Sequence, residues 1–363
     1  MEMLVRDPSV RMCSDASEVI SRMGKLNERF SGKRVLLTGA AGFLGRHFIN
    51  YFNQLNCGGV LTKPCYLVAQ DNFLRGQPGW LRYFDGSGFV ELQQRNVVDP
   101  GSWPIFDFVI HAASVASPIF YRKHPIETMD ANVIGLRNLL EHARTFPVES
   151  FLFFSSSEIY GDPDPANIPT PEHYRGNVSC TGPRACYDES KRFGETLCVN
   201  FHQVHGIPVK IARPFNNYGA GLGLHDQRVL PDFFRDILAG RDIVLLSDGK
   251  ATRTFCYITD AISGYLKVLL SKHEGEAFNI GMEKPEISML ELAQLVIKTT
   301  GKNAKVVSKL SEDPQYLTDN PVRRCPDLRK SRELLDYIPE VSIDEGLRRM
   351  MEFYLEENGA GTG

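Results

Sequence analysis

Tyr187 and Lys191 stand four positions apart near the start of a long stretch with helical periodicity. Residues at this spacing share one face of a helix, so the phenol and the ammonium group would be neighbours. A tyrosine has an ordinary pKa of about 10 and is a poor base at neutral pH, but an adjacent cation stabilises the phenolate. The pair could therefore take a proton from an alcohol while Lys191 holds a ribose. On its own, this spacing is more typical of a surface pair on an amphipathic helix.

A second polar group follows the apolar run that begins at Phe151, where Ser155, Ser156, Ser157 and Glu158 come in succession. If that run is a strand of a parallel sheet, these side chains emerge at its carboxyl edge, where ligands bind. A serine hydroxyl there can share a proton with a substrate hydroxyl, and Glu158 can act as an acid or a base. The alternative is that the four residues only cap a turn, as polar residues after strands often do.

A glycine turn lies upstream of both groups, in the segment from Val35 to Gly45. Gly39 permits a tight turn after an apolar strand, Gly42 lets a pyrophosphate approach the backbone, and Gly45 lets the following helix pack closely. The helix N-terminus then offers unpaired N–H groups and the positive end of its dipole to phosphates. The strand before the turn and the helix after it are the context that a dinucleotide motif requires and that an ordinary flexible turn lacks.

The second strand ends at Asp71, which is followed by Asn72. A carboxylate at this position can accept hydrogen bonds from the adenosine ribose hydroxyls and repels a 2′-phosphate, which favours NAD over NADP. Arg75 lies nearby and would weaken that preference. Asn96, after the third strand, could meet the adenine edge in a similar way.

The elements that must position these groups alternate regularly from Lys33 onward. Short runs rich in β-branched and aromatic residues, typical of strands, occupy 34–38, 66–70, 89–92, 108–111, 151–155 and 209–213. Segments of helical length and periodicity occupy 43–55, 128–145 and 185–205. This alternation predicts an α/β fold, a Rossmann-type doubly wound parallel sheet with helices on both faces.

The alternation breaks after Arg213, where we expect a smaller, partly discontinuous C-terminal substrate lobe that closes over the carboxyl edge of the sheet. The later elements are expected to be helices near 230–239, 261–270, 290–300 and 343–355, a strand near 243–246, and a strand over 255–258 that returns to the main sheet. We divide the chain into an N-terminal extension (1–30, with one amphipathic helix over 16–30), an NAD-binding Rossmann domain (31–215, with 254–272 returning to it) and a substrate-binding lobe (216–253 and 273–358).

The composition of the 363 residues excludes several classes of function. A net charge of −3 offers no basic surplus for a nucleic-acid partner. The eight cysteines form no C-x-x-C pair, which argues against a zinc site and against a disulfide framework, so we expect no bound metal. No stretch approaches the roughly 18 apolar residues of a membrane helix, and no secretory signal is visible. We therefore expect a cytoplasmic protein with no membrane or nucleic-acid partner.

The chain resembles the extended short-chain dehydrogenase/reductase superfamily, and within it most closely the UDP-glucuronate decarboxylases, also called UDP-xylose synthases. The resemblance covers residues from about 32 to about 350. The segments that carry it are GAAGFLG at 39–45, Asp71-Asn72-Phe73, HAASVASP at 111–118, SSSEIYGD at 155–162, GPRACYDESK at 182–191 and TRTF at 252–255. The glycine and Tyr/Lys motifs mark the superfamily, whereas 111–118, 155–163 and 182–191 are specific to the decarboxylase-like branch.

The resemblance implies a complete reaction. Tyr187 would remove the proton from the 4-hydroxyl of UDP-glucuronate while hydride passes to a tightly bound NAD. The 4-keto sugar would lose CO2, and the returning hydride would give UDP-xylose. Glu158, Ser157 and Arg324 match positions that handle the carboxylate and reprotonate C5, so the expected catalytic residues are Tyr187, Lys191, Glu158, Ser157 and Arg324.

The resemblance also implies two sets of binding residues and an assembly. The cofactor would contact Gly39, Gly42, Phe43, Leu44, Gly45, Asp71, Asn72, Asn96, Val97, Ala112, Tyr187 and Lys191. The nucleotide sugar would contact Ser117, Tyr121, Ser156, Asn216, Arg228, Arg253, Tyr257 and Arg324. Members of this superfamily often dimerise through a four-helix bundle, which makes a homodimer through 128–145 and 185–205 the expectation.

Other activities stay open at this point. Sugar-nucleotide 4,6-dehydratases typically carry an Asp-Glu pair where this chain has Ser157-Glu158, and simple 4-epimerases usually lack the glutamate. The loop 217–223 departs from the family pattern, with Asn217 in place of a threonine, and Asn96 replaces an aspartate. An epimerase, dehydratase or 4-dehydrogenase of another nucleotide sugar is therefore the alternative. A non-catalytic sugar-nucleotide-binding protein is a weaker one, since binding alone needs no matched base and acid.

Overall fold

The computed structural model describes residues 7–360 except 102, 310, 314 and 316, so residues 1–6 of the predicted extension lie outside the described residues. A seven-stranded parallel sheet forms the centre, in the order β11-β6-β5-β4-β1-β2-β3. Its strands are β1 (Arg34–Thr38), β2 (Tyr66–Asp71), β3 (Val90–Gln94), β4 (Phe108–His111), β5 (Ser150–Phe154), β6 (Val209–Pro214) and β11 (Ala277–Ile280). The predicted fold class and the first six strands are therefore confirmed.

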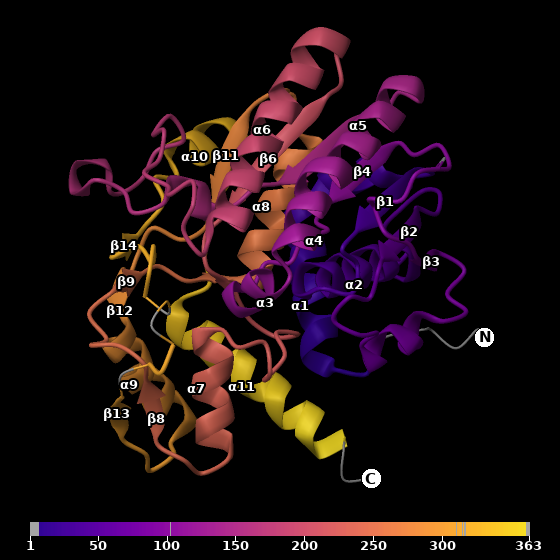
Figure 1. Cartoon of the computed structure of the whole chain (residues 1–363). Coiled ribbons are helices and arrows are strands. Elements are labelled where there is room, and N and C mark those ends of the chain that lie inside the picture. Colours follow the sequence, from indigo (N-terminus) through magenta and orange to yellow (C-terminus); the bar gives the residue numbers. More distant parts are fainter. Residues whose placement is uncertain (1–6, 102, 310, 314, 316, 361–363) are drawn as a thin grey trace.

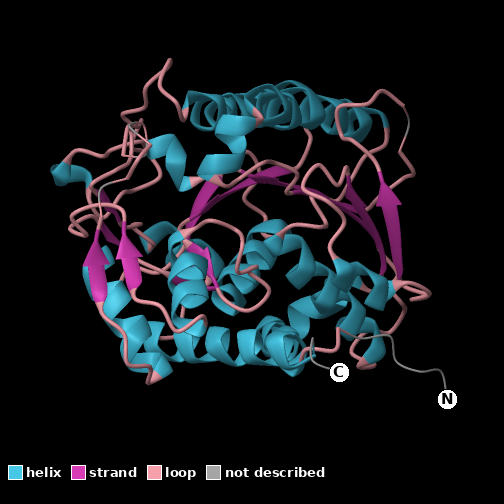
Figure 2. Cartoon of the chain, turned by 60° about the horizontal axis from the view of Figure 1, so that its bottom comes forward, coloured by secondary structure: helices cyan, strands magenta, loops and turns pink. Residues whose placement is uncertain are grey.

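Helices cover both faces of this sheet (Figure 2). One face carries α4 (Pro125–Asp130), the π-helical turn η3 (Ala131–Gly135), α5 (Leu136–Thr145) and α6 (Ala185–His205). The other carries α1 (Val10–Met23), α2 (Phe43–Cys57) and α8 (Ile258–Leu270). The single helix predicted over 128–145 is thus longer and contains a π turn at Gly135. A Cβ on Gly135 would lie 2.4 Å from Cγ2 of Val97, so the helix packs closely here.

The prediction that residues 255–258 return to the main sheet as a strand is wrong. Residues 255–258 contain only the short strand β10 (Cys256–Tyr257), which pairs with β7 (Asn217–Tyr218) in a separate sheet. The seventh strand of the main sheet is β11, which pairs with β6. Two short apolar segments, 255–258 and 277–280, fit an extra strand equally well by pattern, and packing against β6 decides between them.

The N-terminal segment is an integral part of the core. The single helix predicted over 16–30 is instead α1 followed by the 3₁₀ helix η1 (Gly24–Phe30). Gly24 ends α1 with a φ of 49°, a conformation that favours glycine. Helix α1 packs against α2, α8 and α11 (Ile343–Ala360), so it links helices from the beginning and the end of the described residues (Figure 1). Met12, Val19 and Met23 on α1 are buried in the main hydrophobic cluster.

The remaining elements form the region beside the carboxyl edge of the sheet (Figure 1). They are α7 (Val229–Leu238), β8 (Ile243–Leu245), β9 (Thr252–Arg253), β12 (Ile287–Ser288), α9 (Met289–Thr300), β13 (Val306–Ser308) and β14 (Arg323–Arg324). Helix α10 (Arg329–Leu335) instead lies against β11 at the side of the main sheet. Short helices in the connections are η2 (Gly79–Phe84), α3 (Pro118–Lys123), η4 (Ser157–Tyr160) and η5 (Pro165–Asn167). The division into two lobes stays a prediction, and β11 places 277–280 in the sheet.

Candidate active site

The glycine turn connects β1 to α2 in a conformation that excludes side chains. Gly39 has a φ of 75°, and a Cβ there would lie 2.6 Å from the carbonyl oxygen of Ala112. A Cβ on Gly45 would lie 2.3 Å from the carbonyl oxygen of Ala40. Gly42 is the N-cap of α2, so the N-terminus of this helix, with Phe43 and Leu44 in its first turn, opens on the turn. The cradle that a pyrophosphate needs is present.

The residues predicted to meet the adenosine end lie at the ends of β2 and β3. Asp71 accepts hydrogen bonds from the backbone N–H of Ala41 at 3.0 Å and of Phe73 at 2.8 Å, so its carboxylate is fixed beside the glycine turn. Asn72 and Asn96 accept hydrogen bonds from the backbone two residues downstream, at 3.0 and 3.2 Å. Asp71 is therefore bonded to the glycine turn, whereas Asn72 and Asn96 bond within their own loops.

Tyr187 and Lys191 share one face of α6, as their spacing predicts. Lys191 Nζ donates to the carbonyl oxygen of Phe154 at 2.8 Å and lies 5.7 Å from the centre of the Tyr187 ring. Burial lowers the pKa of Lys191 to about 7. Burial also raises the pKa of Tyr187 to about 12, although a hydrogen bond with Ser156 opposes this rise. The expected lowering of the tyrosine pKa is therefore not produced by this geometry, because the cost of burying a phenolate dominates.

The serines after β5 have separate partners. Ser156 accepts a hydrogen bond from the backbone N–H of Glu158 at 3.1 Å, in addition to its bond with Tyr187. Ser155 donates to Glu195 at 2.5 Å, which turns it toward α6. Ser157 is buried in the first turn of η4. Ser156 is thus the serine that joins the tyrosine to the glutamate.

Glu158 is held between two guanidinium groups. Arg324 donates to both carboxylate oxygens, at 2.7 and 2.6 Å, and Arg184 lies 2.6 Å from one of them. Burial raises the pKa of Glu158, but the charges of Arg184 and Arg324 outweigh burial and lower it well below its usual range. Glu158 is therefore a carboxylate at neutral pH and is a poor proton donor in this arrangement.

Arg253 adds a third buried guanidinium to this group. It donates to the backbone carbonyls of Thr252, Pro321 and Val322, at 2.7, 2.5 and 3.1 Å, and forms no ion pair among the described residues. Burial and the nearby charge of Arg324 lower its pKa to about 9. A cation so placed attracts an anion from solution, because its direct partners are dipoles of the protein and the charges of Glu158 and Asp162 act on it only from a greater distance.

Asp188 is the second carboxyl group of this cluster. It lies in the first turn of α6, and its Oδ2 is 4.0 Å from Nε of Arg184. Burial and then the charge of Glu158 raise its pKa, against the opposite effects of Arg184 and Arg324. The cluster, defined as Glu158, Arg184, Asp188, Arg253 and Arg324, thus combines three guanidinium groups with one firmly charged carboxylate.

Of the other predicted substrate residues, two lie near Tyr187 and two donate hydrogen bonds to the backbone of other segments. Tyr121 stacks on Tyr187 with ring centres 5.1 Å apart, and Arg228 lies close enough to lower the pKa of Tyr187 slightly. Ser117 donates to the backbone of Asp226 at 3.3 Å, and Asn216 donates to that of Thr254 at 2.9 Å.

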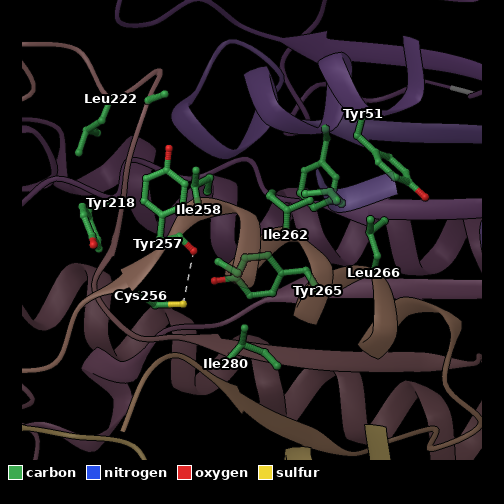
Figure 3. Close-up of a cluster of buried hydrophobic side chains, with 14 of the residues drawn as sticks. Tyr51, Tyr218, Leu222, Cys256, Tyr257, Ile258, Ile262, Tyr265, Leu266 and Ile280 are labelled. Atoms are coloured by element: carbon green, nitrogen blue, oxygen red, sulfur yellow. Dashed lines mark hydrogen bonds between the residues drawn. The ribbon is translucent and has the colours of Figure 1, made fainter. Parts of the chain in front are cut away.

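Tyr257 is not brought to the cluster. It is buried in the hydrophobic core, as Figure 3 shows, and its hydroxyl donates to Asp15 of α1 at 2.8 Å.

The loop 217–223, where the sequence departs from the family pattern, is held from several directions. Nε2 of His47 lies 2.8 Å from the carbonyl oxygen of Ala220, and Tyr354 of α11 donates to that of Leu222 at 2.7 Å. A Cβ on Gly221 would lie 3.3 Å from the sulfur of Met12 in α1. Burial lowers the pKa of His47 to about 4, so its imidazole is neutral and donates from Nε2.

Sequence reasoning gave no role to Arg184 or Asp188, although both lie inside the segment that carries the resemblance. Their spacing of four residues, at the start of a helix, places them on one face beside the tyrosine and was the available signal. In the part of the chain that the structure describes, no group of His, Cys, Asp and Glu could hold a metal ion, and no helix is long and apolar enough to cross a membrane.

Comparisons with known proteins agree with this geometry. The profile of the NAD dependent epimerase/dehydratase family matches residues 35–281. UDP-glucuronic acid decarboxylase 5 of Arabidopsis thaliana is 36% identical over 328 residues, which cover 90% of this chain and 91% of that protein. UDP-glucuronic acid decarboxylase 1 of Xenopus tropicalis is 34% identical over 325 residues, 90% of this chain and 73% of that protein. A solved epimerase structure from Methanothermobacter thermautotrophicus superposes with a TM-score of 0.79 at 26% identity, covering 94% and 97% of the two chains.

Proposed function

Because the chain belongs to the NAD-dependent epimerase/dehydratase family, we propose that it decarboxylates UDP-glucuronate to UDP-xylose through a 4-keto intermediate. The observation that carries this proposal is the excess of positive charge in the cluster around Glu158. A uronate carboxylate is the anion that such a group of arginines suits, since guanidinium forks match carboxylate geometry. The curated relatives named UDP-glucuronic acid decarboxylase support the same substrate.

The residues around the glycine turn fit NAD. The Gly39–Gly45 cradle would hold the pyrophosphate, Asp71 the adenosine ribose and Lys191 the nicotinamide ribose. When bound, the nicotinamide supplies a hydride acceptor for the first step and a hydride donor for the last. Phe43, Leu44, Val97 and Ala112 would line the same site, with Asn72 and Asn96 near the adenine.

Tyr187 acts as the base in the first step. It takes the proton of the sugar 4-hydroxyl as hydride leaves C4, and it returns that proton to O4 in the last step. Burial raises the pKa of Tyr187, so the phenolate needs help, which Ser156 gives through its hydrogen bond and Arg228 through its charge. We propose that Lys191, 5.7 Å from the centre of the ring, adds its own charge. General base catalysis of this kind contributes roughly 10²–10⁴-fold to a rate.

The cluster acts on the carboxylate. In the 4-keto sugar the carboxylate is β to a ketone, so the C5–C6 bond breaks readily and its electron pair flows into the carbonyl. Arg324 and Arg253 hold the carboxylate in place, with Glu158 and Ser157 beside them, while Arg228 and Asn216 contact the diphosphate end. Ser117 and Tyr121 line the sugar. The contact of Tyr257 with the nucleotide sugar stays a prediction from the sequence. A 4,6-dehydratase would need an acid at Glu158, and the two guanidinium groups disfavour that state.

The test is to incubate the purified protein with UDP-glucuronate and NAD while following CO2 release and the product by NMR. UDP-xylose with no net NADH supports the proposal. A UDP-4-keto-pentose with accumulating NADH would leave the decarboxylation but remove the hydride return. UDP-galacturonate without CO2 would instead identify a 4-epimerase. Tyr187→Phe should abolish activity, while Tyr66→Phe, an exposed tyrosine at the start of β2, serves as the matched control.

We also propose that the protein is a homodimer in the cytoplasm. Apolar side chains are exposed on α4, η3 and α6, and a four-helix bundle between two copies would cover them. They are Ile126, Ile134, Phe193 and Val204. Sedimentation of the wild-type protein and of Phe193→Asp tests the assembly, since a charge at that interface should produce monomers. Location in the cytoplasm rests on the sequence alone and is testable by cell fractionation.

A further inference from the structure

Asp188 is a buried carboxyl group that has no role in the proposed reaction. Asp188 directly follows Tyr187 in the sequence of α6, and its side chain lies beside Arg184 of the cluster. Asp188 is 3% exposed, and its Oδ1 has no hydrogen-bond partner among the residues that the structure describes. A buried carboxyl oxygen without a partner is costly in the charged form and much less so in the protonated form.

The charged and titratable groups that face Asp188 come from four elements and one connecting segment. Arg184 and Tyr187 lie on its own helix, Glu158 on η4, Tyr121 on α3, Arg324 on β14, and Asp319 on the segment before β14. The two guanidinium groups are already engaged by Glu158, whereas Glu158 and Asp319 repel a second negative charge. Asp188 therefore retains its proton to a higher pH than an ordinary aspartate.

The resemblance assigns the proton that C5 needs to Glu158, Ser157 and Arg324. Arg324, however, is engaged by both oxygens of Glu158, and neither a serine hydroxyl nor a guanidinium group readily gives up a proton at neutral pH. Tyr187 carries the proton that came from the 4-hydroxyl and must return it to O4. Glu158 is a carboxylate held by two arginines, and the ammonium of Lys191 is turned to the carbonyl of Phe154. C5 is the atom that bears the carboxylate, so it must lie next to the guanidinium groups that hold that carboxylate.

We propose that Asp188 is the acid that protonates C5 after CO2 leaves, an assignment that rests on the proposed function. The C5–C6 bond breaks, its electron pair forms the enolate across C5, C4 and O4, and CO2 departs. The proton of Asp188 then adds to C5 and the ketone at C4 re-forms. Asp188 is left as a carboxylate near Arg184 and regains a proton from solvent before the next turnover.

The charges in the cluster favour this order of events. While the substrate carboxylate is present, it occupies the arginines and opposes a second negative charge on Asp188. Once CO2 has left, the arginines lack that anion, and a carboxylate on Asp188 becomes easier to form. The departure of CO2 therefore makes Asp188 a stronger acid just before C5 needs a proton.

The test uses Asp188→Asn in D2O with UDP-glucuronate and NAD. The wild-type enzyme should place deuterium at one of the two C5 positions of UDP-xylose, which NMR distinguishes. The variant should still reduce NAD and release CO2 in a single turnover, but form UDP-xylose at least about 100-fold more slowly, with deuterium in both positions. Glu189→Gln, the same change at the next residue of α6, is the matched control because Glu189 is half-exposed and pairs with Arg192.

Two results would overturn the assignment. One is a variant that makes UDP-xylose at the wild-type rate with deuterium on a single face. The other is an equal loss of NAD reduction and product, which would make Asp188 a positioning residue for Arg184. If Asp188→Asn does not fold, Asp188→Ala with added formate replaces it, and rescue of the product rate by formate is required. A wild-type enzyme that forms no UDP-xylose would instead refute the proposed function.

Discussion

Two clusters of charged residues in this molecule differ in how their charges are matched. The cluster at the candidate active site joins three arginines to Glu158 and Asp188, and Arg253 has no carboxylate partner among the described residues. The second, which we call the α1 cluster, lies between α1, α8 and α11. It contains Arg11, Arg22 and Arg349 together with Asp15, Glu18 and Asp260.

In the α1 cluster every guanidinium group has a carboxylate close to it. Arg11 lies 2.9 Å from Asp15, and Glu18 lies 2.6 Å from both Arg22 and Arg349. Asp260 pairs with Arg22 and accepts the backbone N–H groups of Glu340 and Val341, both at 2.9 Å. Matched charges of this kind hold helices together. In the candidate active site, by contrast, Arg253 gains a carboxylate partner only when an anion binds. The comparison therefore separates structural charges from functional ones.

The largest expected effect is a loss of activity, caused by a substitution in the cluster at the candidate active site. Arg324→Met should lower kcat/KM for UDP-glucuronate by about 1000-fold, since losing a charge pair with a bound carboxylate costs roughly 4 kcal/mol. The free energy of unfolding should fall by less than in the α1 cluster, because Glu158 keeps Arg184 and the repulsion from Arg253 is relieved. Arg323→Met, at the neighbouring exposed arginine paired with Glu286, is the control for both measurements. A destabilised enzyme with normal kcat/KM would abolish the distinction between the clusters.

The α1 cluster should respond in the opposite way. Arg349→Met should lower the free energy of unfolding by about 3 kcal/mol, because Glu18 and the buried Asp15 then lose a partly buried partner. kcat/KM of the folded enzyme should stay within about twofold of the wild type, well under 1 kcal/mol. Urea unfolding and steady-state kinetics measure the two quantities, with Arg348→Met, an exposed neighbour on α11, as the matched control. If Arg348→Met were equally destabilising, the ion pair would not be the cause.

The pH dependence of stability sharpens the same comparison. Burial raises the pKa of Asp15 from 3.8 to about 6 in the folded protein. Its contribution is therefore fully present below pH 3.8 and is lost as pH rises through about 6, which amounts to about 3 kcal/mol. Glu158 has a lowered pKa and acts in the opposite direction, with stability present at neutral pH and lost in acid.

Urea unfolding of the wild type and of Asp15→Asn, measured between about pH 4 and pH 7, isolates the Asp15 contribution. The difference between the two proteins should change with pH in the sense given above. A difference that is independent of pH would show that Asp15 titrates normally in the folded state.

The smallest expected effect lies between the two regions, in the loop 217–223. His47→Leu removes the donor to the carbonyl of Ala220 and should raise KM for the nucleotide sugar about fivefold, the equivalent of roughly 1 kcal/mol. His47→Gln retains an N–H donor at a similar distance and should stay near the wild type. An unchanged KM in His47→Leu would mean that this hydrogen bond does not position the loop.

The local patterns of the sequence were sufficient to predict the sheet and the glycine turn. Alternating apolar runs identify β1 to β6, and the spacing of Gly39, Gly42 and Gly45 reflects steric limits that the backbone imposes. The assignment of the seventh strand to 255–258 failed because pairing with β6 is decided by long-range packing. For the same reason the sequence did not reveal that Tyr257 bonds to Asp15 of α1.

The candidate site was predictable in its identities and less so in its electrostatics. Glu158 and Arg324 are far apart in the chain. The resemblance assigned both to the substrate carboxylate, but it did not predict that they pair with each other. The state of each group depends on burial and on neighbours from other elements, which is why the raised pKa of Tyr187 and the roles of Arg184 and Asp188 were not foreseen.

Helix α1 also has a consequence for how the chain is made. The ion pair between Glu18 and Arg349 joins residues 331 positions apart. At roughly 5–20 residues per second, a ribosome adds Arg349 roughly 20–60 seconds after Glu18. During that interval the apolar face of α1, with Met12, Val19 and Met23, has no α11 to pack against. Helix α1 can pack on α2 early, but its contact with α11 must wait, and a nascent chain halted before α11 would leave that side of α1 open to chaperones and proteases.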